Sequence, residues 1–79
     1  MYLHIGKDYI ININDIIGIF DIESLKKTNS YDCILKKIKF VKDLSGGKRK
    51  SLIITKNNNK LNAYISNILS TTIASRNDW

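Results

Sequence analysis

The sequence contains no proline, a single cysteine and a single histidine among its 79 residues. The lone cysteine, Cys33, excludes an intrachain disulfide and makes a reducing cytoplasm the expected setting. No apolar run approaches the length of a membrane span, and Met1–His4 lacks the basic-then-apolar pattern of a signal peptide. These absences predict a cytoplasmic protein that does not associate with membranes.

Residues that carry catalysis are equally scarce. His4 falls in an apolar stretch, where a structural imidazole is more common than a general base, and Cys33 has no partner thiol or histidine and is expected to be a small core residue. Asp21 and Glu23 directly follow another apolar run, which fits a strand end or a helix start better than a catalytic pair. No group of potential ligands has metal-site spacing. We therefore expect no enzyme activity, no cofactor and no metal.

The short length limits the core that the chain can build. A chain of 79 residues forms one domain, here residues 1–79, and buries a modest share of its surface. Because disulfide and metal staples are missing, assembly with further copies is the remaining source of extra stability.

The positive net charge of +6 is concentrated in one third of the chain. Residues 1–23 hold one lysine and four carboxylates, whereas residues 24–50 hold nine lysines or arginines and two aspartates. Such asymmetry is typical of a surface that faces a polyanion. The alternative is a lysine-rich composition whose charges lie wherever solvent tolerates them.

Hydrophobic periodicity predicts a small α+β domain with mostly antiparallel strands and two short helices. Early strands that are apolar on both faces should be covered on both sides, by helices or by another subunit. Gly18 indicates a bulge or a close backbone approach.

The expected strands are 2–5, 9–13, 16–20, 39–44, 49–55 and 60–65, with a turn at 57–59. The expected helices are one with the stripe Tyr31, Ile34, Leu35 and Ile38, and a last one that buries Ile68, Leu69, Thr72 and Ile73. In strand 60–65, Leu61, Ala63 and Ile65 should face the core, opposite Lys60, Asn62 and Tyr64.

The stretch "LSGGKRKSLIIT", residues 44–55, places two glycines and three cations before a β-branched run. We expect a tip between strands 39–44 and 49–55, where glycine lets the backbone approach a partner closely. Strand alternation would point Lys48 and Lys50 one way and Arg49 the other, so that a phosphate backbone meets cations on both sides. A nucleotide-binding P-loop is excluded, because Lys42 and Arg49 occupy positions that this motif reserves for glycine and for serine or threonine.

The opening "MYLHIGKDYIININDIIGIFD" and the later "KSLIIT" resemble the small bacterial extracellular-matrix regulators of the RemA/RemB type. The likeness is greater to the RemB branch, through the Met-Tyr start, "HIG" and "DIIGIFD". The resemblance implies a cytoplasmic protein that binds double-stranded DNA and controls transcription of biofilm matrix genes. It also implies a fold akin to the LytTR DNA-binding domain and a ring of identical subunits, with a RemA-type paralogue as a further possible partner.

The resemblance assigns DNA contact to Gly47, Lys48, Arg49 and Lys50. Here the charge is mostly lysine, which binds phosphate as a point charge and lacks the planar fork that reads guanine. RemA-type proteins also use an arginine just before the third strand, where this chain has Asp15. Two other functions remain open. One is a structural subunit that pairs with itself or a paralogue without binding DNA; the other is single-stranded RNA binding, which favours exposed aromatic side chains.

Overall fold

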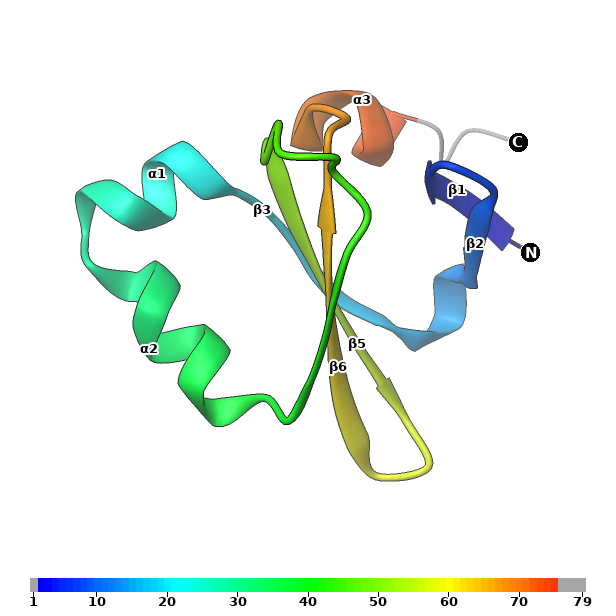
Figure 1. Cartoon of the computed structure of the whole chain (residues 1–79). Helices are drawn as coiled ribbons and strands as arrows, with labels where there is room; N and C mark the ends of the chain where they lie inside the picture. Colours follow the sequence, from blue (N-terminus) through cyan, green and yellow to red (C-terminus); the bar gives the residue numbers. More distant parts are fainter. Residues whose placement is uncertain (1, 76–79) are drawn as a thin grey trace.

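A four-stranded mixed sheet lies between a helical layer and a β-hairpin layer (Figure 1). The structure, a computed structural model, describes residues 2–75. The strand order is β3 (Ile16–Asp21), β5 (Ser51–Asn57), β6 (Lys60–Ser66), β4 (Phe40–Asp43). The β3–β5 and β5–β6 pairs are antiparallel, whereas β4 pairs with β6 in parallel. The predicted α+β class is confirmed.

Helices α1 (Ile22–Lys27) and α2 (Ser30–Lys37) cover one face of the sheet. The hairpin of β1 (Tyr2–Gly6) and β2 (Tyr9–Asn12) covers the other face together with α3 (Ser70–Ser75), and the 3-10 turn η1 (Ile13–Asp15) leads into β3. The helix-side core consists of Ile22, Tyr31, Ile38, Leu52, Ala63 and Ile65. The hairpin-side core consists of Leu3, Ile5, Ile11, Leu44, Ile53, Tyr64 and Ile73.

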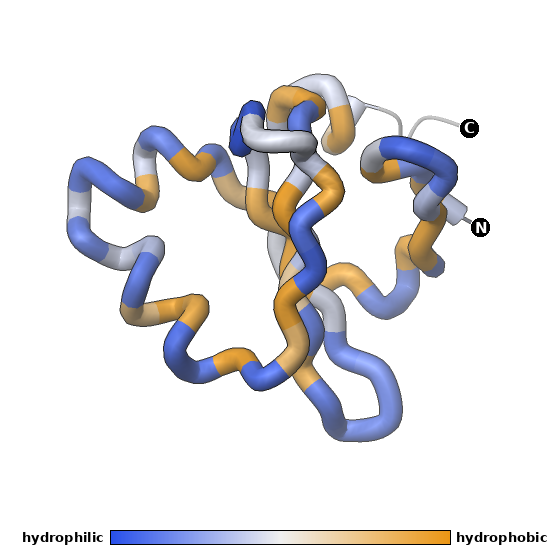
Figure 2. The backbone as a smooth tube through the Cα atoms, in the orientation of Figure 1, coloured by the Kyte–Doolittle hydropathy of each residue, from blue (hydrophilic) through white to orange (hydrophobic). Residues whose placement is uncertain are grey.

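Strand β5 carries consecutive apolar residues because both of its faces are covered. Leu52 belongs to the helix-side core and Ile53 to the hairpin-side core, because successive side chains point to opposite faces. Both are fully buried. At the far end, Asn58 and Asn59 both have positive φ, the geometry of a tight hairpin turn, and Figure 2 shows this turn as a hydrophilic segment. The predicted turn at 57–59 is therefore confirmed.

Three helices occur within residues 2–75, one more than expected. The additional helix is α1, whose N-cap is Asp21: Asp21 Oδ2 accepts hydrogen bonds from Ser24 N at 3.0 Å and from Ser24 Oγ at 2.9 Å. A side-chain oxygen at this position satisfies an amide that the first turn leaves without a partner. The interpretation of Asp21 as a helix start is confirmed. The helix itself was not predicted, because six residues are too few to show a helical period.

The Gly18 prediction is also confirmed. The pairing of β3 with β5 shifts register between Ile16 and Gly18, so Ile17 has no partner on β5. The ring of Phe20 lies directly over Gly18, where an added Cβ would approach ring carbons to 2.7 Å. Glycine here therefore leaves the space that the aromatic ring occupies.

Several predicted faces are wrong. Within residues 2–75 no helix covers the outer side of the hairpin, where Tyr2 and Ile10 are largely exposed; cover by another subunit stays a prediction. Leu61 is exposed, because the β5–β6 turn extends beyond both covering layers (Figure 1). Tyr64 is buried, because the hairpin covers the face of the sheet to which it points. Cys33 is exposed rather than in the core, and so are Leu69, directly before the last helix, and Thr72 within it.

Candidate nucleic-acid interface

The predicted site residues lie in the connection between β4 and β5, which we call the basic loop (residues 45–50). It is not a hairpin tip, because β6 lies between the two strands that the loop joins. The loop instead crosses the end of β6, where Leu44 N donates to Ile65 O at 2.7 Å and Lys50 N donates to Ser66 O at 2.9 Å. Both ends of the loop are thus fixed to the same strand.

The first half of the loop is held by Ser45, which is buried, and by Asp43. Asp43 Oδ1 accepts hydrogen bonds from Ser45 N at 2.8 Å and from Ser45 Oγ. Ser45 Oγ accepts from Gly47 N at 3.2 Å, and Ser45 O accepts from Lys48 N at 3.3 Å. These bonds, the Ser45 hydroxyl first and its amide second, lower the pKa of Asp43, and Arg49 adds to the effect. The loop is therefore anchored by a carboxylate that stays ionised at neutral pH.

The glycines form the most open part of the loop. Gly46 and Gly47 have φ of +64° and +99°, which other residues adopt only with strain. Apart from each glycine itself and its two chain neighbours, no heavy atom of the described structure lies within 4 Å of where their Cβ atoms would stand. The backbone is therefore accessible to a partner at this point.

The three cations are exposed and precede β5, so strand alternation does not set their directions. Arg49 turns toward Asp43, with Arg49 Nε at 3.2 Å from Asp43 Oδ2, and both side chains remain partly in solvent. Lys50 is fixed through its backbone, since its carbonyl accepts from Ile22 N at 3.1 Å. The loop thus presents cations on a rigid backbone, with one of them paired to an internal carboxylate.

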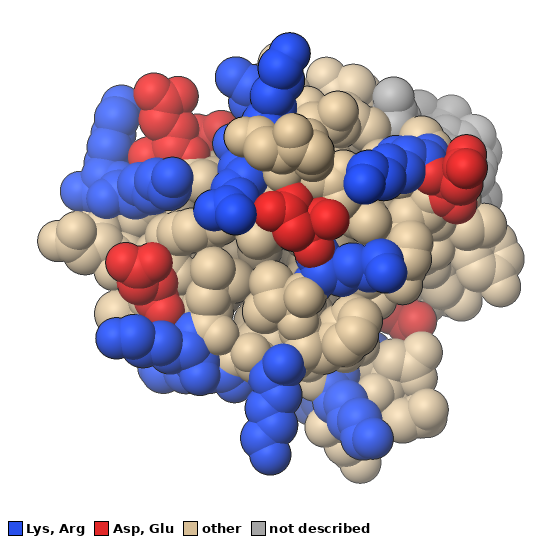
Figure 3. All heavy atoms as spheres, in the orientation of Figure 1, with Lys and Arg blue, Asp and Glu red and all other residues tan. Residues whose placement is uncertain are grey.

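Sequence reasoning missed a fourth cation beside the loop. Lys26 of α1 lines two neighbouring cavities of about 330 and 360 Å³, and Arg49 lines both as well. The Lys26 ammonium lies 5.3 Å from the centroid of the Tyr31 ring. Figure 3 shows Lys and Arg side chains standing out from the loop end of the sheet and from the helical side, with acidic groups between them. The position of Lys26 beside the loop could not be predicted from the sequence, because it depends on the path of the loop toward α1.

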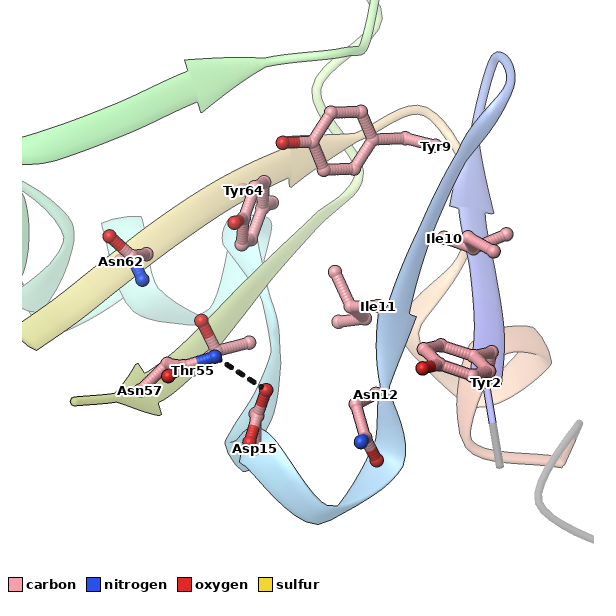
Figure 4. A pocket seen from close by; sticks show the side chains of 10 residues that line it. All are labelled: Tyr2, Tyr9, Ile10, Ile11, Asn12, Asp15, Thr55, Asn57, Asn62 and Tyr64. Atoms are coloured by element: carbon pink, nitrogen blue, oxygen red, sulfur yellow. Dashed lines mark hydrogen bonds between the residues drawn. The ribbon is translucent and has the colours of Figure 1, made fainter.

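Asp15 lies at the opposite end of the sheet from the basic loop. Its Oδ2 accepts a hydrogen bond from Asn57 Nδ2 at 3.1 Å, in a cavity of about 350 Å³ between the hairpin and the sheet (Figure 4). Strand β5 begins at Ser51 beside the loop and ends at Asn57, a span of about 20 Å at the usual rise of a strand. Asp15 therefore does not share a surface with the basic loop within one chain.

We expect Asp43→Ala to loosen the basic loop while leaving the sheet intact. It removes the acceptor of two Ser45 bonds and should cost about 1 kcal/mol of unfolding free energy. Hydrogen exchange should accelerate at the Ser45 and Gly47 amides. Because the folded pKa is lowered, the contribution of Asp43 is complete above its unfolded pKa and is lost as pH falls through the folded value. The stability difference from wild type should therefore shrink below about pH 4; a difference that is constant down to pH 2 would contradict this role.

Within residues 2–75, no group of three or more His, Cys, Asp and Glu side chains is arranged to hold a metal ion. None of the helices in that range is long and apolar enough to cross a bilayer.

Comparison with known proteins defines the class to which this small domain belongs. Residues 2–76 match the RemA-like family, described as "Extracellular matrix regulatory protein A-like", and the chain is a member of that family. A curated relative is Extracellular matrix regulatory protein B of Bacillus subtilis (strain 168). It is 30% identical over 76 residues, which cover 96% of this chain and 89% of the relative. The resemblance read from the opening residues is confirmed.

Proposed function

We propose that this protein is a cytoplasmic DNA-binding regulator of transcription of biofilm matrix genes. In this proposal it acts as a ring-shaped homo-oligomer with a LytTR-like fold, and the basic loop contacts the phosphates of double-stranded DNA. Gly47, Lys48, Arg49 and Lys50 make those contacts, with Lys26 beside them. Membership in a family of extracellular-matrix regulators supports the regulatory role.

The observation that carries the proposal is the combination of rigidity and exposed charge in one loop. A solvated turn needs no buried anchor, yet Ser45 is buried and bonded on both sides, and Lys50 is tied to β6. Cations carried on an anchored backbone lose less backbone freedom when they meet a phosphate than cations on a mobile loop do. Because lysine dominates, the contacts should position the protein on the backbone rather than read bases.

Binding rather than catalysis is part of the proposal. The His4 ring contacts the Lys7 carbonyl at the hairpin turn, and Cys33 is exposed on α2, so the two candidate nucleophile and base residues lie in different layers of the fold. We propose no cofactor for the same function.

A second candidate is a subunit that assembles with itself or a paralogue and binds no DNA. It is favoured by the large apolar side chains on the surface of this chain, including Ile17, Phe20, Phe40 and Val41. Both functions use assembly, so they differ only in whether the basic loop meets DNA.

The deciding experiment measures native mass and DNA mobility shift together across a salt series. The proposed function predicts an oligomer that retards duplexes of unrelated sequence, with an affinity that falls steeply as salt rises. An oligomer that shifts no DNA at low salt would replace the proposal with the second candidate. A monomer that shifts DNA would leave the basic loop as the site and remove the ring.

A further inference from the structure

Both outer strands of the central sheet have an open edge within residues 2–75. Among the described strands, β3 pairs only with β5, and β4 pairs only with β6. All four residues of β4 are exposed. An uncovered edge presents backbone amide and carbonyl groups to which another strand can add.

The directions of the two edge strands match. Strand β3 runs antiparallel to β5, which runs antiparallel to β6, so β3 and β6 point the same way. Strand β4 is parallel to β6, so β3 and β4 are also parallel. If β3 of one copy joins β4 of another, each copy keeps the same strand direction and still offers a free edge. Repetition of this head-to-tail contact generates a ring when the rotation closes.

The two edges are also of comparable length and carry exposed apolar groups. The bulge at Ile17 leaves Gly18–Asp21 as the regular part of β3, four residues that match the four of β4. Ile17 and Phe20 are 58% and 37% exposed on β3, and Phe40 and Val41 are 47% and 40% exposed on β4. Large apolar groups on an uncovered sheet edge are typical of an interaction surface.

The charges at the edges distinguish head-to-tail from two-fold pairing. Strand β3 is preceded by Asp15 and ends with Asp21, whereas β4 is preceded by Lys39 and contains Lys42. The one acid of β4, Asp43, is already paired with Arg49. Two β3 edges would place carboxylates together, and two β4 edges would place lysines together. A β3 edge against a β4 edge puts Asp15 and Lys39 at the same end of the ladder, where opposite charges attract.

We propose that the interface between copies of this chain is a parallel pairing of β3 from one copy with β4 of the next, which continues the sheet from subunit to subunit. The inference rests on the assembly part of the proposed function and adds to it the two surfaces and their head-to-tail order. It does not depend on DNA binding, because assembly is measured without DNA. Asp15 and Lys39 stand at the end of the two edges that is remote from the basic loop, whereas Asp21 and Asp43 end the two edges beside it.

The test uses two variants that each damage one edge. Ile17→Lys places a cation where the lysines of β4 would meet it, and Val41→Glu places an anion where Asp15 and Asp21 would meet it. Each variant alone should sediment as a folded monomer, because a head-to-tail contact needs both edges. An equimolar mixture should form species of two or more chains, because the intact β4 of the first variant can join the intact β3 of the second.

Ile10→Lys is the matched control, since Ile10 is also a strand isoleucine and is 56% exposed, but it lies on the hairpin. It should assemble like wild type. The inference is overturned if either edge variant assembles alone, if the mixture stays monomeric, or if wild type is monomeric at 100 µM. Circular dichroism confirms that each variant folds; should one fail, Asp15→Lys and Lys39→Glu form a milder pair for the same mixing experiment. Failure here would leave DNA contact by the basic loop intact, because low-salt mobility shifts measure that contact separately.

Discussion

Replacing Lys48, Arg49 and Lys50 together with alanine should reduce DNA affinity by a similar factor on every duplex tested. If each side chain neutralises one phosphate, the plot of log affinity against log salt should flatten by about one unit per cation, or about three in all per loop. At 150 mM salt the loss should exceed a hundredfold. Unfolding free energy should change by less than about 0.5 kcal/mol for each residue, since exposed cations contribute little to the fold.

Lys56→Ala is the control for this experiment. Lys56 is an exposed lysine on the same strand that follows the loop, but it stands near the opposite end of β5. Its removal should leave the salt slope close to that of wild type. A triple variant with an unaltered slope would remove the basic loop from the DNA-binding surface, and equal effects of the two changes would indicate a diffuse charge effect.

Ile17→Lys should lower DNA affinity by roughly a hundredfold or more, although no residue of the basic loop is changed. One loop offers only three cations, and so few phosphate contacts bind weakly at physiological salt. A ring places many loops along one duplex, so that each contact after the first is intramolecular. The substitution adds a positive charge, which by itself would strengthen binding to DNA, so a loss of affinity isolates the effect of assembly.

Sedimentation and mobility shift on the same samples check this result. We expect a folded, smaller species that binds DNA only at low salt, with the shallow salt dependence of a single loop. A monomeric variant that shifts DNA as strongly as wild type would contradict avidity as the source of affinity. Ile19→Lys is unsuitable here, because Ile19 packs against the hairpin-side core and the change would test stability instead.

Local patterns in the sequence were sufficient for much of the fold. The β-branched run at 49–55 predicted strand β5, and the Tyr31–Ile38 stripe predicted α2 and its buried side. The turn at Asn58 and Asn59 followed from the tolerance of asparagine for positive φ. Each of these depends on neighbours within a few residues, which is why periodicity and turn chemistry could predict them.

Pairings between distant segments could not be read in the same way. The parallel register of β4 on β6 is set by how the chain crosses the sheet, so the basic loop was expected as a hairpin tip. The same crossing brings Lys26 next to Arg49. The resemblance grouped Asp15 with the basic loop, because RemA-type proteins have an arginine at the position of Asp15. In the structure the length of β5 separates the two. The cationic residues of the site were predictable, but their neighbours were not.

The attachment of the basic loop to β6 also has a consequence for the order in which the chain folds. The β5–β6 hairpin is closed by a two-residue turn and can form locally, whereas β4 pairs with residues more than 20 positions later, such as Asp43 with Ile65. Pairings across long loops carry the larger entropy cost and are expected late. The loop acquires its shape only when Asp43 and Ser66 are both in place. A nascent or partly unfolded chain would therefore carry the cations without the loop geometry on which the proposed DNA contact rests.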